Sequence, residues 1–254
     1  MTGMLFSPAG GAPGYGLFPA LAADRLTHGV FGRHGGGSCA PYHSLNVSFG
    51  VGDDPEVVLA NRVLLKKALG IATLVSARQV HRDRILSITT EPGADFEADG
   101  YDALITNCRA GLMIQQADCQ AIIILDPDTP ALGVVHVGWR GSVAGIIGTT
   151  VRALTESFGS DPARLRAAIS PALGACCAEF INYRRELPAW MHAFQVRANY
   201  FDFPAISTHQ LEEAGLIAER ISRAGVCTRC NPDYFSFRRD RITGRYATVA
   251  ALVG

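Results

Sequence analysis

Cys119 and His136 are the residues of this sequence whose types and spacing most clearly suggest chemistry. Cys119 lies just before the apolar run Ala121–Leu125, and His136 directly follows the run Leu132–Val135. The stretch between the two runs, Asp126–Pro130, is rich in proline and aspartate and favours a turn. The sequence therefore predicts a hairpin of two buried strands, whose open end brings a thiol and an imidazole together.

A thiol beside an imidazole supports two kinds of catalysis. The pair could be a cysteine nucleophile with its base, or it could supply two of the three protein ligands of a catalytic zinc ion. His81, which ends the β-like run Leu74–Val80, is the candidate third ligand. A His/Cys/His set would leave one of four tetrahedral positions open for water or substrate, and zinc can lower the pKa of bound water to about 7.

Cu²⁺ is less consistent with the sequence than Zn²⁺. A multi-copper oxidase needs several coppers and therefore many histidines, but the chain has seven histidines and none of them form a His-x-His pair. Two other classes stay open: a metal-free hydrolase with Cys119 as nucleophile and His136 or His81 as base, and a non-catalytic binding or scaffold protein, with a nucleotide as one possible ligand.

An anion site is predicted near these residues. Arg33 precedes three consecutive glycines, which allow a close approach of the backbone to a ligand. Arg140 lies at the start of a helix predicted over Ser142–Phe158, where free N–H groups favour an anion. Both arginines are therefore candidate phosphate contacts, and Asn46 is a further candidate on the far side of the glycine loop.

The composition limits the class of partner. The chain has 254 residues, 48% of them hydrophobic and 18% charged, with a formal net charge of zero. This balance gives no general electrostatic reason to bind nucleic acid or an anionic membrane, so the expected partner is a small molecule. No apolar run approaches the ~20 residues that span a bilayer. Seven cysteines, an odd number, without a signal-peptide pattern predict a reducing cytoplasm.

The elements expected around the site form a single domain over residues 18–254, preceded by a poorly ordered tail over residues 1–17. The sequence predicts a helix that starts at Asp54-Pro55 and ends at Gly70, with turn-forming roles for Asp99 and Asp102. Further expected elements are helices over Glu186–Asn199 and Ser207–Ala224 and a closing hairpin over Tyr234–Ala247.

The remaining cysteines do not predict a second metal site. Cys227 and Cys230 form a single C-x-x-C motif with no second pair, which does not support a zinc site of four cysteines. Cys176 and Cys177 are adjacent, and side chains of neighbouring residues point in different directions from the backbone.

Several short motifs, taken together and in order, resemble the YfiH-like laccase-domain family from about Leu26 to the C-terminus. They are Arg33 with its glycine loop, Ser44-Leu45-Asn46, Gln79-Val80-His81, Ala117-Asp118-Cys119, His136–Gly141, Ser170–Gly174, Phe235–Asp240 and Thr243-Gly244-Arg245. Each motif is short, and the resemblance depends on the ordered set.

The resemblance implies a layered α+β fold of mixed β-sheets with helices packed outside. It implies that His81, Cys119 and His136 bind zinc and that Arg33, Asn46 and Arg140 line the substrate site, with Arg33 also catalytic. Members of the family were formerly named polyphenol oxidases or laccases. The implied activity is phosphorolysis of adenosine, inosine and methylthioadenosine to the free base and a ribose 1-phosphate type product, with adenosine deaminase as a side activity. The implied partners are a purine nucleoside and phosphate.

Overall fold

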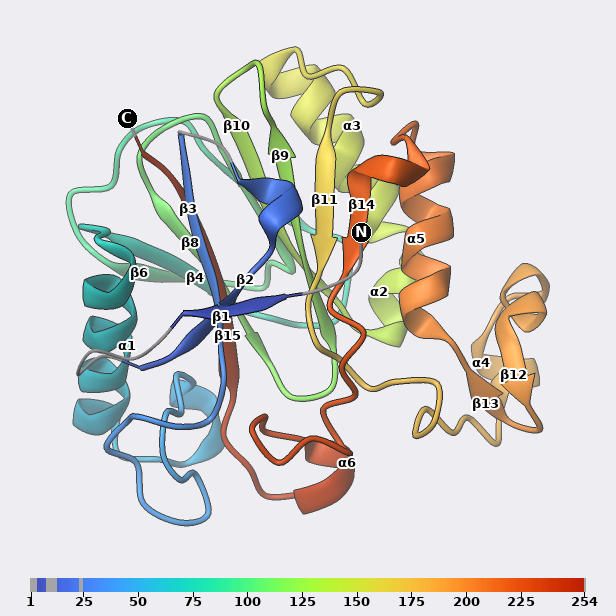
Figure 1. Ribbon diagram of the computed structural model, residues 1–254, viewed down its shortest axis with the longest axis horizontal. Coiled ribbons are helices and arrows are strands. Elements are labelled where there is room, and N and C mark those ends of the chain that lie inside the picture. Colours follow the sequence, from blue (N-terminus) through green and yellow to red (C-terminus); the bar gives the residue numbers. More distant parts are fainter. Residues whose placement is uncertain (1–3, 8–12, 23–24, 254) are drawn as a thin grey trace.

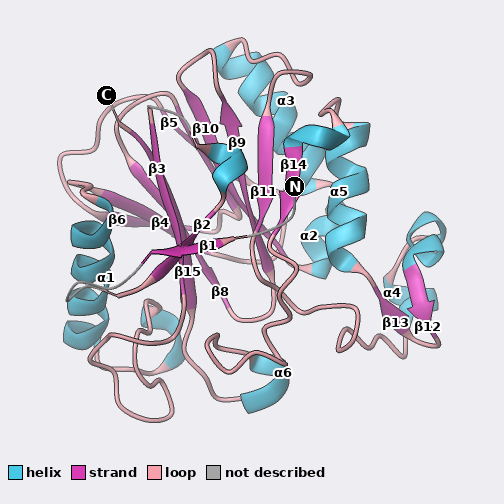
Figure 2. Ribbon diagram, viewed as in Figure 1, coloured by secondary structure: helices cyan, strands magenta, loops and turns pink. Residues whose placement is uncertain are grey.

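Two mixed β-sheets packed face to face form the centre of the computed structural model, which describes residues 4–7, 13–22 and 25–253 (Figures 1 and 2). In the described residues the first sheet has seven strands, in the order β1 (Leu5–Ser7), β2 (Tyr15–Leu17), β3 (Leu26–Phe31), β15 (Tyr246–Leu252), β8 (Gly111–Gln116), β4 (Leu74–Arg78) and β6 (Phe96–Asp99). The second has six, in the order β14 (Ile221–Arg223), β11 (Arg166–Ile169), β9 (Gln120–Asp126), β10 (Ala131–Val137), β7 (Ala103–Thr106) and β5 (Ile85–Ile88).

Helices cover the outer faces of both sheets. Helix α1 (Pro55–Leu69) packs on the seven-stranded sheet, and α3 (Ile146–Phe158) and α5 (Phe203–Glu213) pack on the six-stranded sheet (Figure 1). The shorter elements are α2 (Trp139–Ala144), α4 (Tyr183–Glu186), α6 (Phe237–Asp240), the hairpin β12 (Gln195–Arg197) and β13 (Tyr200–Phe201), and 3-10 turns at Pro19–Leu21, Phe49–Val51, Ala189–Phe194 and Ala218–Arg220. The predicted layered α+β fold, with helices outside a pair of sheets, is confirmed.

The central strands β9 and β10 are buried on both faces, which explains why they appear in the sequence as continuous apolar runs. In β9, Ile123 belongs to the core between the two sheets, whereas Ile122 and Ile124 belong to the core under α3. Successive side chains of a strand point to opposite faces, so a strand between two cores needs apolar residues at every position.

Helix α1 has the ends that the sequence predicts. The Asp54 carboxylate accepts a hydrogen bond from the backbone N–H of Glu56 at 2.9 Å, and Pro55 occupies the first turn, where no intrahelical N–H is required. Gly70 ends the helix in the left-handed conformation (φ 67°) that a glycine adopts without steric cost.

Other helix boundaries differ from the predictions because of single residues. The predicted helix Glu186–Asn199 is wrong: Pro188 separates α4 from a 3-10 turn, and β12 follows, since proline lacks an N–H and disfavours helical backbone before it. The helix predicted over Ser142–Phe158 is divided into α2 and α3 by Gly145 at φ 77°.

Two predictions near the C-terminal end also need correction. The helix predicted over Ser207–Ala224 is α5, which begins four residues earlier because the Asp202 carboxylate caps it, accepting from Ala205 N–H at 2.9 Å. The helix ends at Glu213 and not at Ala224, since Gly215 has a positive φ of 100° and a 3-10 turn and β14 follow. The closing hairpin predicted over Tyr234–Ala247 is wrong: the segment contains the helical turn α6, capped by Ser236, and strand β15, which pairs with β3 and β8.

The stretch expected to be a tail, residues 1–17, contributes β1 and β2 to the edge of the seven-stranded sheet in its described part. Tyr15 packs its ring on Phe31, 5.1 Å between centroids, which anchors β2 to β3. Residues 1–3 and 8–12 lie outside the described residues. Among the helices of the described chain, none has both the length and the apolar character to cross a membrane.

Truncating the central strand should cost far more stability than truncating the surface. We expect Ile123→Ala, at a position with no solvent exposure, to lower the free energy of unfolding by about 2–5 kcal/mol. The matched change Ile181→Ala, at a side chain that is 72% exposed, should alter it by no more than about 0.5 kcal/mol. Urea unfolding followed by circular dichroism measures both, and equal losses would contradict the assignment of β9 to the core.

Candidate active site

The hairpin β9–β10 brings Cys119 and His136 together, as the sequence predicts. The two strands are antiparallel, with His136 opposite Ala121, so Cys119 lies just beyond the paired end of β9. His81 follows β4 and completes the group: the ligand atoms of the three side chains all lie within 4.8 Å of one another. Cys119 Sγ is 3.9 Å from His81 Nε2. The predicted convergence is confirmed, and the metal-binding role of the three residues stays a prediction.

Asp102 holds two of these three residues and was missed as a functional residue. It has no solvent exposure, and its Oδ1 atom accepts hydrogen bonds from His136 Nδ1 at 2.8 Å and from the backbone N–H of His81 at 2.9 Å. Oδ2 accepts from the N–H groups of Val80 and Arg82 at 3.2 and 2.9 Å. The prediction that Asp102 forms a turn is therefore wrong.

The Asp102 carboxylate also determines which nitrogen of His136 is free. Because Nδ1 donates to Asp102, neutral His136 carries its lone pair on Nε2, as expected of a metal ligand or a general base. Burial would raise the pKa of Asp102, but the hydrogen bonds from His136 and from the backbone lower it below its usual range. The carboxylate therefore stays charged at neutral pH.

Cys119 and His136 perturb each other's protonation. Burial opposes ionisation of the thiol, but the charge of His136 and hydrogen bonds from both histidines outweigh it and lower the pKa of Cys119 to about 6. Burial also opposes protonation of His136, but the Cys119 thiolate and the Asp102 carboxylate raise the pKa of His136 to about 9. In the metal-free protein, a thiolate beside an imidazolium is thus favoured near neutral pH.

Two residues of the site have backbone conformations that non-glycine residues rarely adopt. His81 has φ 60° and Asp118, next to Cys119, has φ 84°. Such conformations cost about 1–3 kcal/mol each and persist only where the surroundings enforce them. For Asp118, the carbonyl accepts from Leu173 N–H at 2.8 Å, and the carboxylate accepts from Thr228 Oγ1 at 2.7 Å and from Arg238 N–H at 2.6 Å.

The donor set fits zinc. One thiolate and two imidazoles are the sulfur and nitrogen donors that zinc binds in catalytic sites, where three protein ligands leave a position open. Gly138 allows the close packing of this group, because a Cβ atom there would lie 2.9 Å from His81 Cδ2 and 3.2 Å from Cys119 Sγ.

A cavity of about 550 Å³ opens beside the three donor residues, all of which line it. This volume is in the range of small-molecule sites, about 300–1,000 Å³. Its wall contains the aromatic residues Trp139, Phe180, Phe203 and Phe237 and the polar residues Arg78, Gln79, Glu97, Gln115, Asp118, Gln120, Arg238 and Arg245. Gln120 Oε1 is buried and has no hydrogen-bond partner among the described residues.

The predicted substrate residues lie in three different places. Arg140 lies over the ring of Trp139 and lines a second hollow together with Val80, His81 and Arg82. Arg33 lies outside both hollows, where its Nε donates to the His43 carbonyl at 3.0 Å and its guanidinium covers Phe235.

Asn46 is buried, and its side-chain oxygen accepts from the backbone N–H groups of Ser48 and Arg245 at 3.1 and 2.9 Å. Asn46 therefore bonds two residues of the cavity wall, Ser48 and Arg245, but does not itself line the cavity. The roles of Arg33, Asn46 and Arg140 in binding substrate stay predictions.

Comparison with known proteins agrees with the fold. Residues 27–253 match the family described as multi-copper polyphenol oxidoreductase laccase. A purine nucleoside phosphorylase of Streptomyces coelicolor is 37% identical over 227 residues, covering 86% of this chain and 92% of the relative. The crystal structure of YlmD from Geobacillus stearothermophilus superposes with a TM-score of 0.87 at 28% identity, covering 99% of this chain and 100% of YlmD. That of the hypothetical protein YfiH from Bacillus licheniformis gives 0.86 at 27% identity, covering 98% and 99%.

Replacing Asp102 by asparagine should weaken metal binding. An amide in either orientation would direct its NH₂ group at two N–H donors, and the neutral side chain would no longer fix the His136 tautomer. We expect Asp102→Asn to reduce zinc affinity by about 10–100-fold, measured by competition with a chromophoric chelator. Asp99→Asn is the matched control, because Asp99 is exposed and its carboxylate pairs with Arg78 at the surface. Equal affinity of the two variants would contradict the assigned role.

The Cys119 thiol should titrate at an unusually low pH in the metal-free protein. Because its pKa is lowered to about 6, alkylation by iodoacetamide should slow as the pH falls through about 6, and not through the ordinary thiol value of about 8.5. Mass spectrometry of the peptide that contains Cys119 measures this rate separately from the other cysteines. A midpoint near the ordinary value would mean that His136 and His81 do not stabilise the thiolate.

Proposed function

The chain belongs to the family described as multi-copper polyphenol oxidoreductase laccase, and we propose that it is a zinc-dependent purine nucleoside phosphorylase. The observation that carries this proposal is the convergence of His81, Cys119 and His136 on the wall of a cavity that aromatic rings and arginines also line. The S. coelicolor relative, which is named a purine nucleoside phosphorylase, supports the same reaction.

The proposed reaction transfers a ribosyl group from a purine to phosphate. An oxygen of phosphate bonds to the anomeric carbon of ribose while the bond from that carbon to the purine nitrogen breaks. The electron pair of the broken bond stays on the purine, which takes up a proton. Adenosine, inosine and methylthioadenosine are the proposed nucleosides, and the products are the free base and ribose 1-phosphate, or its methylthio counterpart.

The cavity wall offers contacts for the purine base of such a substrate. The rings of Phe180 and Phe203, 4.8 Å apart between centroids, provide apolar surface against which a planar base can stack. Gln120 Oε1, which has no partner in the described part of the chain, can accept a hydrogen bond from a purine amino or ring N–H group.

Arginines suit the phosphate, because the guanidinium group forms paired hydrogen bonds to oxyanions. Arg245 and Arg238 line the cavity, and Arg140 lies beside His81 at the neighbouring hollow. Asn46 positions Arg245 through the hydrogen bond to its backbone. We propose Arg33, whose side chain lies near Asp240 and Phe235, as a further support of this wall.

Zinc is the proposed metal. Bound by His81, Cys119 and His136, it would supply a Lewis acid and lower the pKa of a bound water to about 7, which also suits the proposed adenosine deaminase side activity. Among the described residues, one group of potential metal ligands contains histidine, namely His81, Cys119 and His136. A multi-copper polyphenol oxidase needs histidines for several copper ions, so this single group does not support that activity.

A cysteine hydrolase is the second candidate, favoured by the lowered pKa of Cys119 beside His136 and His81. In that case the thiolate would attack a carbonyl group and either histidine would protonate the leaving group. The proposed ligands for either reaction are small molecules. A cytoplasmic location stays a prediction from the cysteine usage.

Phosphate dependence separates the proposed activities. With adenosine, we expect adenine release only when phosphate is present, whereas inosine formation should persist without it. Cys119→Ala and His81→Ala should lose zinc and both activities, and Cys39→Ala, at an exposed loop cysteine, should keep them. Chromatography of adenine, inosine and hypoxanthine measures the products. Hydrolysis of esters or amides without turnover of any nucleoside would favour the cysteine hydrolase.

A further inference from the structure

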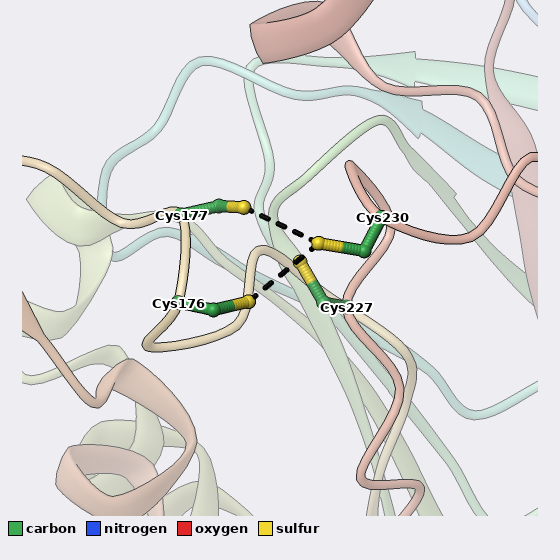
Figure 3. Close-up of side chains that lie close together, drawn as sticks. All are labelled: Cys176, Cys177, Cys227 and Cys230. Atoms are coloured by element: carbon green, nitrogen blue, oxygen red, sulfur yellow. Dashed lines mark hydrogen bonds between the residues drawn. The ribbon is translucent and has the colours of Figure 1, made fainter.

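We propose that Cys176, Cys177, Cys227 and Cys230 bind a second zinc ion with a structural role (Figure 3). The four sulfur atoms all lie within 4.8 Å of one another, and all four residues are free thiols. In Figure 3 the side chains point toward a common centre from two separate loops. The proposal does not depend on the function proposed for the cavity.

The sulfur separations match a tetrahedral zinc site better than a pair of disulfides. Cys230 Sγ is 3.7 Å from Cys176 Sγ and 3.4 Å from Cys177 Sγ. Four sulfurs at a Zn–S distance of about 2.3 Å in tetrahedral geometry are separated by about 3.8 Å. A disulfide would require about 2.05 Å. Four thiolates without another donor form a closed zinc site, which is typical of structural and not of catalytic zinc.

The sequence has a single C-x-x-C motif, Cys227 and Cys230, and the fold brings the adjacent Cys176 and Cys177 to it as the second pair. Cys177 N–H and Ala178 N–H both donate to the Gly174 carbonyl, at 2.9 and 3.0 Å, and this tight turn directs the adjacent Cys176 and Cys177 to the same side. The expectation that adjacent cysteines point away from a common ligand is therefore wrong here. The C-x-x-C segment turns in the same way, with Asn231 N–H bonded to the Cys227 carbonyl at 2.9 Å.

Backbone groups around the cluster suit thiolate ligands. The backbone N–H groups of Cys230 and Gly174 donate hydrogen bonds to the Cys227 sulfur. A side chain at position 174 would prevent this approach, because its Cβ would lie 2.9 Å from Cys227 Cβ and 3.5 Å from Cys176 Sγ. Arg197 and Arg238 donate to the carbonyls of Cys176 and Cys177, at 3.0 and 3.3 Å, and bring positive charge near a site that four thiolates make negative.

The two loops joined by the cluster are the same loops that hold Asp118 beside Cys119. Leu173, three residues before Cys176, donates to the Asp118 carbonyl, and Thr228, inside the C-x-x-C segment, donates to the carboxylate. Thr228 N–H also donates to the Ala172 carbonyl at 2.9 Å, which links the loops directly. A zinc ion bound by both loops would therefore stabilise the strained backbone at Asp118.

Metal content and X-ray absorption at the zinc edge test the proposal. Wild-type protein purified without added chelator should carry two zinc ions per chain. Cys119→Ala should keep one, with only sulfur neighbours at about 2.3 Å, and the double variant Cys227→Ser/Cys230→Ser should keep one with mixed nitrogen and sulfur neighbours. Cys39→Ser/Cys108→Ser is the matched control for removing two cysteines outside both groups and should keep two zinc ions.

Thiol protection provides a second measurement that requires no variant of the cluster. In Cys119→Ala protein, the four cluster cysteines should resist alkylation until a strong chelator removes the zinc. The proposal would be overturned if this variant held no zinc and its four cysteines were alkylated freely, or if peptide mapping showed them joined as disulfides. Zinc absent from the histidine group but present with sulfur neighbours would contradict the proposed function and leave the structural site intact.

Discussion

The buried Asp102 carboxylate is the interaction on which the candidate active site depends. It is the residue before β7, and it joins the end of β10, through the His136 ring, to the loop that carries His81, through three backbone N–H groups. These hydrogen bonds stabilise the negative charge of the Asp102 carboxylate, which has no contact with solvent and would otherwise be destabilised by burial. Breaking such a buried pair by removing one partner costs about 3–5 kcal/mol. The same bonds hold His81 at a positive φ, so one side chain determines the positions of two proposed ligands.

Near this carboxylate, the candidate metal ligands lie at the ends of buried strands. The two sheets and their outer helices bury β9 and β10 on both faces, and the rigid hairpin presents Cys119 and His136 at its open end. Asp118 adds a second strained position, held by bonds from Leu173, Thr228 and Arg238. Strained backbone conformations that hydrogen bonds maintain are common at functional sites, where they fix the side chains in position before a ligand binds.

The sequence predicts the part of this site that depends on local patterns. Continuous apolar runs around a Pro-Asp turn predict the hairpin, and the residues at its open end follow directly from its antiparallel pairing. Asp102 could not be assigned in the same way, because its role depends on β7 pairing with β10, and no local pattern specifies that neighbour. The segment predicted as a helix over Glu186–Asn199 is interrupted by Pro188, whose backbone restriction ends α4. The cysteine cluster has no local signature in the sequence, because its two halves lie in distant loops.

The central claim is that phosphate, and not water, takes the ribosyl group in the cavity beside His81, Cys119 and His136. Phosphorus NMR of zinc-loaded protein with inosine and inorganic phosphate tests it most directly. The account predicts a sugar phosphate ester resonance that grows in equal amount with hypoxanthine, while inorganic phosphate declines. Hypoxanthine appearing with free ribose and an unchanged phosphate signal would show hydrolysis and contradict the account.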